Sequence, residues 1–174
     1  MSGHSRTKAR FAGLAALAAA ALAAFTAAAE PQLPAAIAAP EQTPIVALQA
    51  AGAQIYECKE SAGKLAWAFR EPIAALMQDG RTVGRHYAGP TWEHADGSAV
   101  VGKAAASAPG ATTDDVAWLR LDVVERRGGG VLSTATSVQR INTHGGALSG
   151  PCPERGALRA VPYSADYVFL RKGR

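Results

Sequence analysis

The segment VAWLRLDVVER, residues 116–126, alternates apolar and polar side chains. Successive side chains of a β-strand point to opposite sides, so a period of two predicts a strand with one buried face. The apolar members share one face: Ala117, Leu119, Leu121 and Val123. Arg120 and Asp122 fall on the other face. This segment therefore predicts a half-buried strand and not a helix.

The same alternation extends to both sides of this segment. Leu65, Trp67 and Phe69 share a face before it, and Tyr163, Ala165, Tyr167 and Phe169 share one after it. Turn pairs separate the apolar runs at Ala62-Gly63, Asp79-Gly80 and Asp96-Gly97, and a glycine run follows at residues 128–130. Such pairs are favoured where a hairpin needs positive φ.

These signals predict an all-β fold of short strands joined in sequence. We expect strands over residues 53–60, 64–70, 73–78, 81–87, 90–94, 98–106, 116–126, 130–142 and 162–171. Consecutive hairpins form a single antiparallel meander, which closes into a barrel or a two-layer sandwich. The residues expected to face the core are Leu65, Trp67, Phe69, Leu119, Leu121 and Tyr167.

The N-terminus has the pattern of an export signal. Residues 1–10 are basic without acids, residues 11–25 are rich in Ala and Leu, and Ala27 and Ala29 provide small residues for cleavage after Ala29. Alanine is too weakly apolar for a convincing membrane anchor, so we expect a periplasmic or secreted protein with no membrane insertion of the mature chain. Residues 30–44 read as a Pro/Ala-rich linker, and residues 45–174 as a single β domain. A short helix over residues 43–51 is an alternative for the start of that domain.

The charge balance argues against a nucleic-acid partner. The net charge is +4, and Arg6, Lys8 and Arg10 of the signal supply three of these charges. The remaining chain is nearly neutral, so it offers no electrostatic surface for nucleic acid or an anionic membrane.

The chain has two cysteines, Cys58 and Cys152. In an oxidising compartment we expect them to form one disulfide, which would tie down the long loop of residues 143–161. A metal site is not expected, because His4, His86, His94 and His144 have no ligand spacing with either cysteine. No cofactor is expected either, since no G-x-G-x-x-G motif follows a strand.

Several motifs together resemble the exported bacterial and fungal family called domain of unknown function 3455. The resemblance extends from about Gly52 to Phe169 and implies export and one compact domain, but no activity. Some relatives carry a dehydrogenase label, which the absent dinucleotide motif does not support. The motifs that carry the resemblance are Gln54-Ile55-Tyr56-x-Cys58, the run of residues 86–93, Asp96-Gly97-Ser98, Trp118-Leu119, Gln139-Arg140 with Thr143-x-Gly145-Gly146, Cys152, and the run of residues 161–169.

The densest group of polar and aromatic residues defines the candidate site. It comprises His86, Tyr87, Trp92 and Glu93, which lie around a Gly89-Pro90 bend. The favoured interpretation is a non-catalytic module that binds a small molecule, a glycan or a partner such as a cell-surface component. The alternative is a hydrolase or isomerase in which His86 acts with Glu93 or Asp96. Binding is preferred because the sequence shows no nucleophile motif, metal set or cofactor motif.

A second polar group lies near the C-terminus. Asp166 stands between apolar strand residues, and a buried carboxylate needs a partner. Arg140 or Arg120 could supply this partner, and we favour a structural pair of Arg140 with Asp166 over a catalytic role for Asp166.

Overall fold

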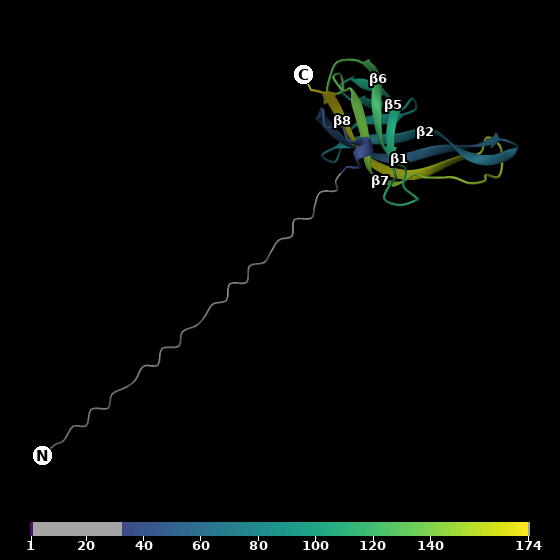
Figure 1. Ribbon diagram of the computed structural model, residues 1–174, viewed down its shortest axis with the longest axis horizontal. Helices are drawn as coiled ribbons and strands as arrows, with labels where there is room; N and C mark the ends of the chain where they lie inside the picture. Colours follow the sequence, from purple (N-terminus) through teal and green to yellow (C-terminus); the bar gives the residue numbers. More distant parts are fainter. Residues whose placement is uncertain (2–32, 174) are drawn as a thin grey trace. The chain divides into compact units, whose positions relative to one another are not determined.

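The structure is a computed structural model that describes Met1 and residues 33–173. The predicted signal and the first residues of the predicted linker lie outside the described part. Leu33–Arg174 form one unit, made of a 3-10 helix and eight strands (Figure 1). In order these are η1 (Ala35–Ile37), β1 (Gln42–Ser61), β2 (Lys64–Gln78), β3 (Arg81–Tyr87), β4 (Thr91–His94), β5 (Ala99–Ala108), β6 (Trp118–Arg127), β7 (Ser137–Gly145) and β8 (Leu158–Lys172).

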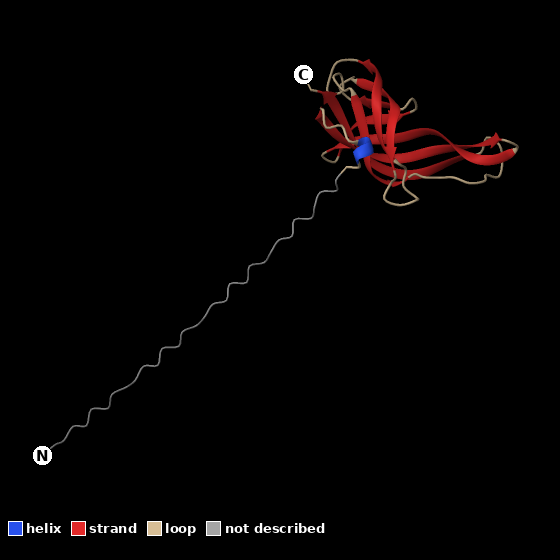
Figure 2. Cartoon of the chain, in the orientation of Figure 1, coloured by secondary structure: helices blue, strands red, loops and turns tan. Residues whose placement is uncertain are grey.

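The strands form one antiparallel sheet that closes on itself. Each strand pairs with the next one in the sequence, and β1 pairs with β8 over almost its whole length. Figure 2 shows strands throughout, with η1 as a single short turn of helix. The prediction of an all-β antiparallel meander is confirmed, and of the two predicted closures the chain adopts the barrel.

Two of the predicted turn pairs make tight hairpins. Ala62 and Gly63 join β1 to β2, and Asp79 and Gly80 join β2 to β3, all four with φ between 50° and 74°. Two consecutive residues with positive φ match the twist of the flanking strands. These turns fix the register of three successive strands.

The predicted strands over residues 64–70 and 73–78 are one strand, β2, which continues past a bulge. Opposite β1, Ile55 pairs with Glu71 and Tyr56 with Phe69, so Arg70 is the extra residue. A bulge bends the strand without ending it, which alternation alone does not reveal.

The first part of β2 extends beyond the barrel with its partner β1. The strand β3 pairs with β2 only from Ala74 onward, so on that side residues 64–73 have no strand as a neighbour, only the loop after β7, which bridges to Ala66 through Pro151. Leu65 and Trp67 are therefore only half-buried, and Phe69 is 53% exposed. The expectation that these three residues lie in the core is wrong for this reason, whereas Leu121 and Tyr167 are buried as predicted and Leu119 packs against the core.

The folded domain begins earlier than residue 45. Ile37 of η1 is fully buried, η1 packs against β5 and β6, and the Ile37 carbonyl accepts a hydrogen bond from Gln139 Nε2 at 2.7 Å. The strand β1 starts at Gln42 and occupies the segment for which a helix was the alternative. Pairing with β8 provides partners for this backbone, which explains why the alanine-rich segment is extended.

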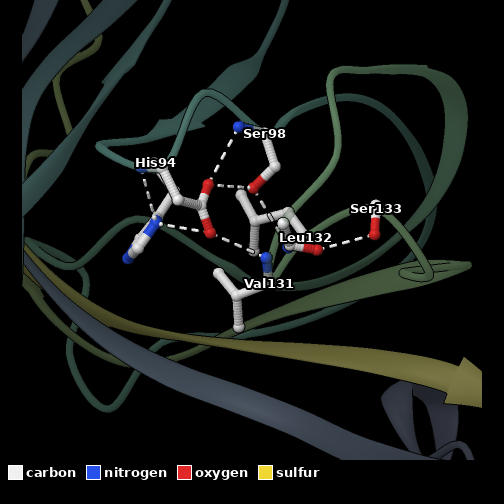
Figure 3. Close-up of polar contacts among 7 residues, drawn as sticks. His94, Ser98, Val131, Leu132 and Ser133 are labelled. Atoms are coloured by element: carbon white, nitrogen blue, oxygen red, sulfur yellow. Dashed lines mark hydrogen bonds and ion pairs between the residues drawn. The ribbon is translucent and has the colours of Figure 1, made fainter.

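The predicted strand over residues 130–142 begins only at Ser137. The preceding residues turn instead, because polar groups of the β4–β5 turn take their backbone N–H groups (Figure 3). The Asp96 carboxylate accepts hydrogen bonds from Val131 N at 2.7 Å and Ser98 Oγ at 2.6 Å, and Ser98 Oγ accepts one from Leu132 N at 3.1 Å. This arrangement seats Leu132, with no exposed surface, in the core.

Candidate functional site

The predicted site residues divide between the two faces of the sheet. His86 pairs directly with Trp92 across β3 and β4, and both are buried, with 3% and 1% of their surface exposed. Tyr87 and Glu93 point to the opposite face, because neighbouring strand residues alternate. Of the four predicted site residues, two therefore point into the barrel and two point outside.

The outward pair belongs to a surface network. The Tyr87 hydroxyl donates to Glu93 Oε2 at 2.9 Å, and Arg85 Nη2 donates to both Glu93 oxygens at 3.0 and 3.1 Å. The Arg85 guanidinium also lies 5.1 Å from the centre of the Tyr87 ring. Hydrogen bonds from Tyr87 and then Arg85 lower the pKa of Glu93. This carboxylate is held ionised outside the barrel and is not brought to His86.

The inward pair lines a cavity of about 920 Å³. Its wall combines aromatic side chains with aliphatic ones from β6 and from the loops before β6 and after β7. The exposed residues Phe69, Ala104 and Asp114 mark its mouth. The aromatic and aliphatic members of the wall include Tyr56, Phe69, His86, Trp92, Tyr167, Val116, Leu119, Leu121 and Leu148. An eight-stranded barrel is wide enough to hold one small ligand, and this volume is in the range of small-molecule sites.

Three rings of the cavity wall pack against one another. His86 stacks on Trp92 with ring centres 4.5 Å apart and planes 9° apart. Tyr167 meets both edge-on, at 4.9 Å from His86 and 5.2 Å from Trp92. A Cβ on Gly102 would lie 2.9 Å from the Trp92 ring, so the absence of a side chain there makes room for the indole. These contacts hold the rings in fixed positions in the cavity wall.

His86 is a neutral imidazole in this environment. Its Nδ1 lies 2.8 Å from the Thr91 carbonyl oxygen, which can only accept, so Nδ1 carries the proton. Burial lowers the pKa of His86 from 6.5 to about 4, and the hydrogen bond to Thr91 offsets only part of this effect. At neutral pH, Nε2 is therefore left as a hydrogen-bond acceptor.

The carboxylates predicted as partners of His86 have other contacts. Glu93 lies on the outer face, and Asp96 accepts hydrogen bonds in the β4–β5 turn. Burial acts to raise the pKa of Asp96, but the hydrogen bonds from Ser98 and Val131 outweigh it and hold the pKa well below the ordinary value. The described part of the structure thus contains no pairing of His86 with Glu93 or Asp96.

Arg140 was not predicted as a site residue, but it lines the cavity. The expected pair with Asp166 does not form. Asp166 accepts a hydrogen bond from Asn142 Nδ2 at 2.8 Å, while Arg140 Nε and Nη2 donate to the Ala117 carbonyl at 3.0 and 2.8 Å. Arg140 is the cross-strand partner of Tyr167, whereas Asp166 is one residue further along and faces the other side.

The charge of Arg140 acts on titratable rings of the wall. Burial lowers the pKa of His86, and the Arg140 charge lowers it further. Burial raises the pKa of Tyr56 and of Tyr167, and the Arg140 charge partly offsets this rise. The strand period offered a signal for this residue, because it places Arg140 on the same face as the buried Val138. An arginine in an inward position of a barrel strand is unusual enough to mark a site.

Two residues of the wall carry deeply buried side-chain donors. Burial raises the pKa of the neighbouring Tyr163 hydroxyl and a hydrogen bond from Gln54 acts to lower it, whereas Trp92 Nε1 has no hydrogen-bond partner among the described residues. Among the described residues, no group of three His, Cys, Asp or Glu side chains is placed to hold a metal ion.

The disulfide between Cys58 and Cys152 joins β1 to the loop after β7, with Cα atoms 5.7 Å apart. That loop contributes Ala147, Leu148 and Ser149 to the cavity wall. The predicted disulfide is confirmed, and it supports one side of the cavity.

Fold and site together define a small disulfide-linked antiparallel barrel with a mixed aromatic and cationic cavity. The chain belongs to the family described as protein of unknown function (DUF3455), whose model matches residues 38–171. No curated protein and no solved structure matches the chain. The resemblance noted from the sequence motifs is thereby confirmed.

No helix within residues 33–173 is long and apolar enough to cross a membrane.

Proposed function

We propose that this protein is a binding module that takes a small molecule into the barrel cavity. The observation that carries the proposal is the cavity of about 920 Å³, whose wall combines aromatic and aliphatic side chains with the His86 imidazole and the Arg140 guanidinium. A few polar groups in a mainly apolar wall are typical of small-molecule sites. A cavity with a mainly apolar wall and an open mouth also suits a small molecule better than an extended glycan or a protein surface.

Catalysis by His86 with a carboxylate has less support. General acid–base chemistry needs the two groups within hydrogen-bond reach, directly or through one water. Glu93 and Asp96 instead make hydrogen bonds to Tyr87 and to Ser98. The stacked, neutral His86 ring is better suited to accepting a hydrogen bond from a ligand.

The test uses a neutral fluorescent probe, N-phenyl-1-naphthylamine, excited at its own wavelength. We expect its emission to rise on mixing with the purified protein. Ala104→Trp should fill the exposed mouth of the cavity and weaken probe binding about 10-fold or more, at a cost of roughly 1.4 kcal/mol in binding. Ala105→Trp changes the adjacent exposed residue of β5, which does not line the cavity, and should bind as the unmodified protein does.

Two outcomes would reject the cavity as the site. One is no emission change with protein that is shown to be folded. The other is equal binding by the Ala104→Trp and Ala105→Trp variants.

We also infer that the protein works outside the cytoplasm, in the periplasm or as a secreted protein. The sequence pattern of residues 1–29 supports export with cleavage near Ala29. The disulfide supports it as well, because disulfides persist mainly in oxidising compartments.

A further inference from the structure

The Arg140 guanidinium is a positive charge on the inner face of the barrel. Direct cross-strand partners share a face, and Arg140 is paired with Leu119 on β6 and with Tyr167 on β8. Both neighbours line the cavity with it. No carboxylate within residues 33–173 forms a salt bridge with Arg140. A half-buried charge of this kind is stabilised when an opposite charge reaches it.

The backbone orients this guanidinium and leaves donors for a ligand. Arg140 Nε and Nη2 both donate to the Ala117 carbonyl, which fixes the plane of the group. Arginine has five N–H donors, so these two bonds leave three more. Burial raises the pKa of Tyr167, and a hydrogen bond from Arg140 to the Tyr167 hydroxyl acts to lower it. Arginine donors in a fixed plane match the geometry of a carboxylate.

The polar side chains beside Arg140 add no negative charge. Gln54 and Trp92, which line the same cavity, are uncharged. The acidic groups of the wall are at the loop before β6, where Asp115 already accepts hydrogen bonds from Gly145 N and from both Thr112 donors. The interior therefore offers donors and a positive charge to a ligand rich in acceptors.

Resting on the proposed binding function, we infer that the cavity selects a small carboxylate with an apolar body. The carboxylate binds Arg140, and the apolar body lies against the Trp92 and Tyr167 rings and the aliphatic side chains of β6. Aromatic rings provide a large apolar contact area, and the guanidinium distinguishes an acid from its neutral analogue.

The test compares two molecules that differ in charge and almost nothing else, 2-naphthoate and 2-naphthamide. Each displaces the neutral probe from the exported, disulfide-bonded protein at neutral pH. We expect 2-naphthoate to bind about 10-fold or more tightly than 2-naphthamide, as expected for a charge-assisted hydrogen bond. Arg140→Gln should bring this ratio close to one while the affinity for the neutral probe changes little. The control, Arg120→Gln, removes the same charge from the neighbouring strand on the outer face and should keep the ratio.

The outcomes separate this inference from the proposed function. Equal affinity of the intact protein for the acid and the amide, with the neutral probe still bound, overturns the carboxylate inference and leaves the binding function standing. Failure of every probe to bind overturns the binding function itself. If Arg140→Gln loses the neutral probe too, Arg140→Lys serves in its place. This variant keeps the charge but lacks the planar donors, so we expect its acid-to-amide ratio to be lower than that of the unmodified protein. If Arg140→Lys has the same ratio as the unmodified protein and Arg120→Gln, the role of the guanidinium is contradicted.

Discussion

The imidazole of His86 packs against both the Trp92 and the Tyr167 rings and is 3% exposed. Protonation would place a charge in this apolar environment, with the Arg140 charge also opposing it. The free energy of unfolding should therefore respond to pH in a window set by this one group.

We predict that the protein loses stability as the pH falls from about 6.5 to about 4. Between these values the unfolded chain binds a proton that folded His86 does not, so the free energy of unfolding rises with pH and levels off above about 6.5. The full change is on the order of 3 kcal/mol. Chemical denaturation across this window should show the slope in the unmodified protein and little of it in His86→Phe, which keeps an aromatic ring but cannot titrate.

The control for this prediction is His144→Gln, which changes an exposed histidine outside the large cavity. It should leave the slope unchanged. Asp96 and Asp115, whose pKa values are lowered from 3.8, change the free energy of unfolding mainly at pH values below this window. Equal slopes for His86→Phe and the unmodified protein would show that His86 is not the titrating group.

The extended β1–β2 hairpin depends on the loop after β7 for cover. The loop adds backbone hydrogen bonds from Trp67 N to Gly150 O at 3.1 Å and from Cys58 N to Ala157 O at 2.8 Å. With the disulfide, these bonds hold the loop against the hairpin and place Leu148 in the cavity wall. A segment with so little regular structure of its own needs such ties to stay ordered.

We predict that the double variant Cys58→Ser/Cys152→Ser is less stable by roughly 2–4 kcal/mol and binds the neutral probe more weakly. The loss of stability comes from the entropy that the cross-link removes from the unfolded chain, and the weaker binding comes from a loosened cavity wall. Thermal unfolding and probe titration measure the two effects. The unmodified protein treated with a reductant should reproduce both, and unchanged probe binding in a folded double variant would show that the loop wall does not need the disulfide.

At the scale of the whole molecule, closure depends on the two ends of the folded chain. β1 and β8 pair along most of their lengths, from Gln42 opposite Lys172 to Glu57 opposite Leu158. Their contact also places Leu48 beside Tyr167 and so completes the inner wall. Because the pairing of β1 with β8 closes the ring of strands, loss of either strand would open the cavity wall.

We predict that the exported protein starts at Glu30 and contains no free thiol. Cleavage after the Ala27-x-Ala29 pattern gives this N-terminus, and the Cys58–Cys152 bond uses both cysteines. Intact mass with and without alkylation, before reduction, checks both statements. Two alkylated thiols in the unreduced exported protein would contradict the disulfide, and a retained N-terminal segment would contradict the cleavage site.

Local pattern was sufficient to predict much of the fold. Alternation identified β6 and most of β8, and turn pairs such as Asp79-Gly80 identified the hairpins, because both signals depend on neighbouring residues. The bulge at Arg70 and the start of β1 at Gln42 were missed, since each depends on what the paired strand provides. The same distinction applies to the candidate site. Residue types grouped His86 and Trp92, which line the cavity, with Tyr87 and Glu93, which face the other way because adjacent strand residues alternate.

The sequence by itself determined that this chain forms an antiparallel β meander with one disulfide, because side-chain alternation, turn chemistry and a single cysteine pair leave few other solutions. Only the tertiary structure decided that the meander closes as a barrel around a cavity and that Arg140 faces it without Asp166. The reason is physical: closure, enclosed volume and the pairing of a buried charge depend on side chains and strands far apart in the sequence, which meet only when β1 and β8 come together.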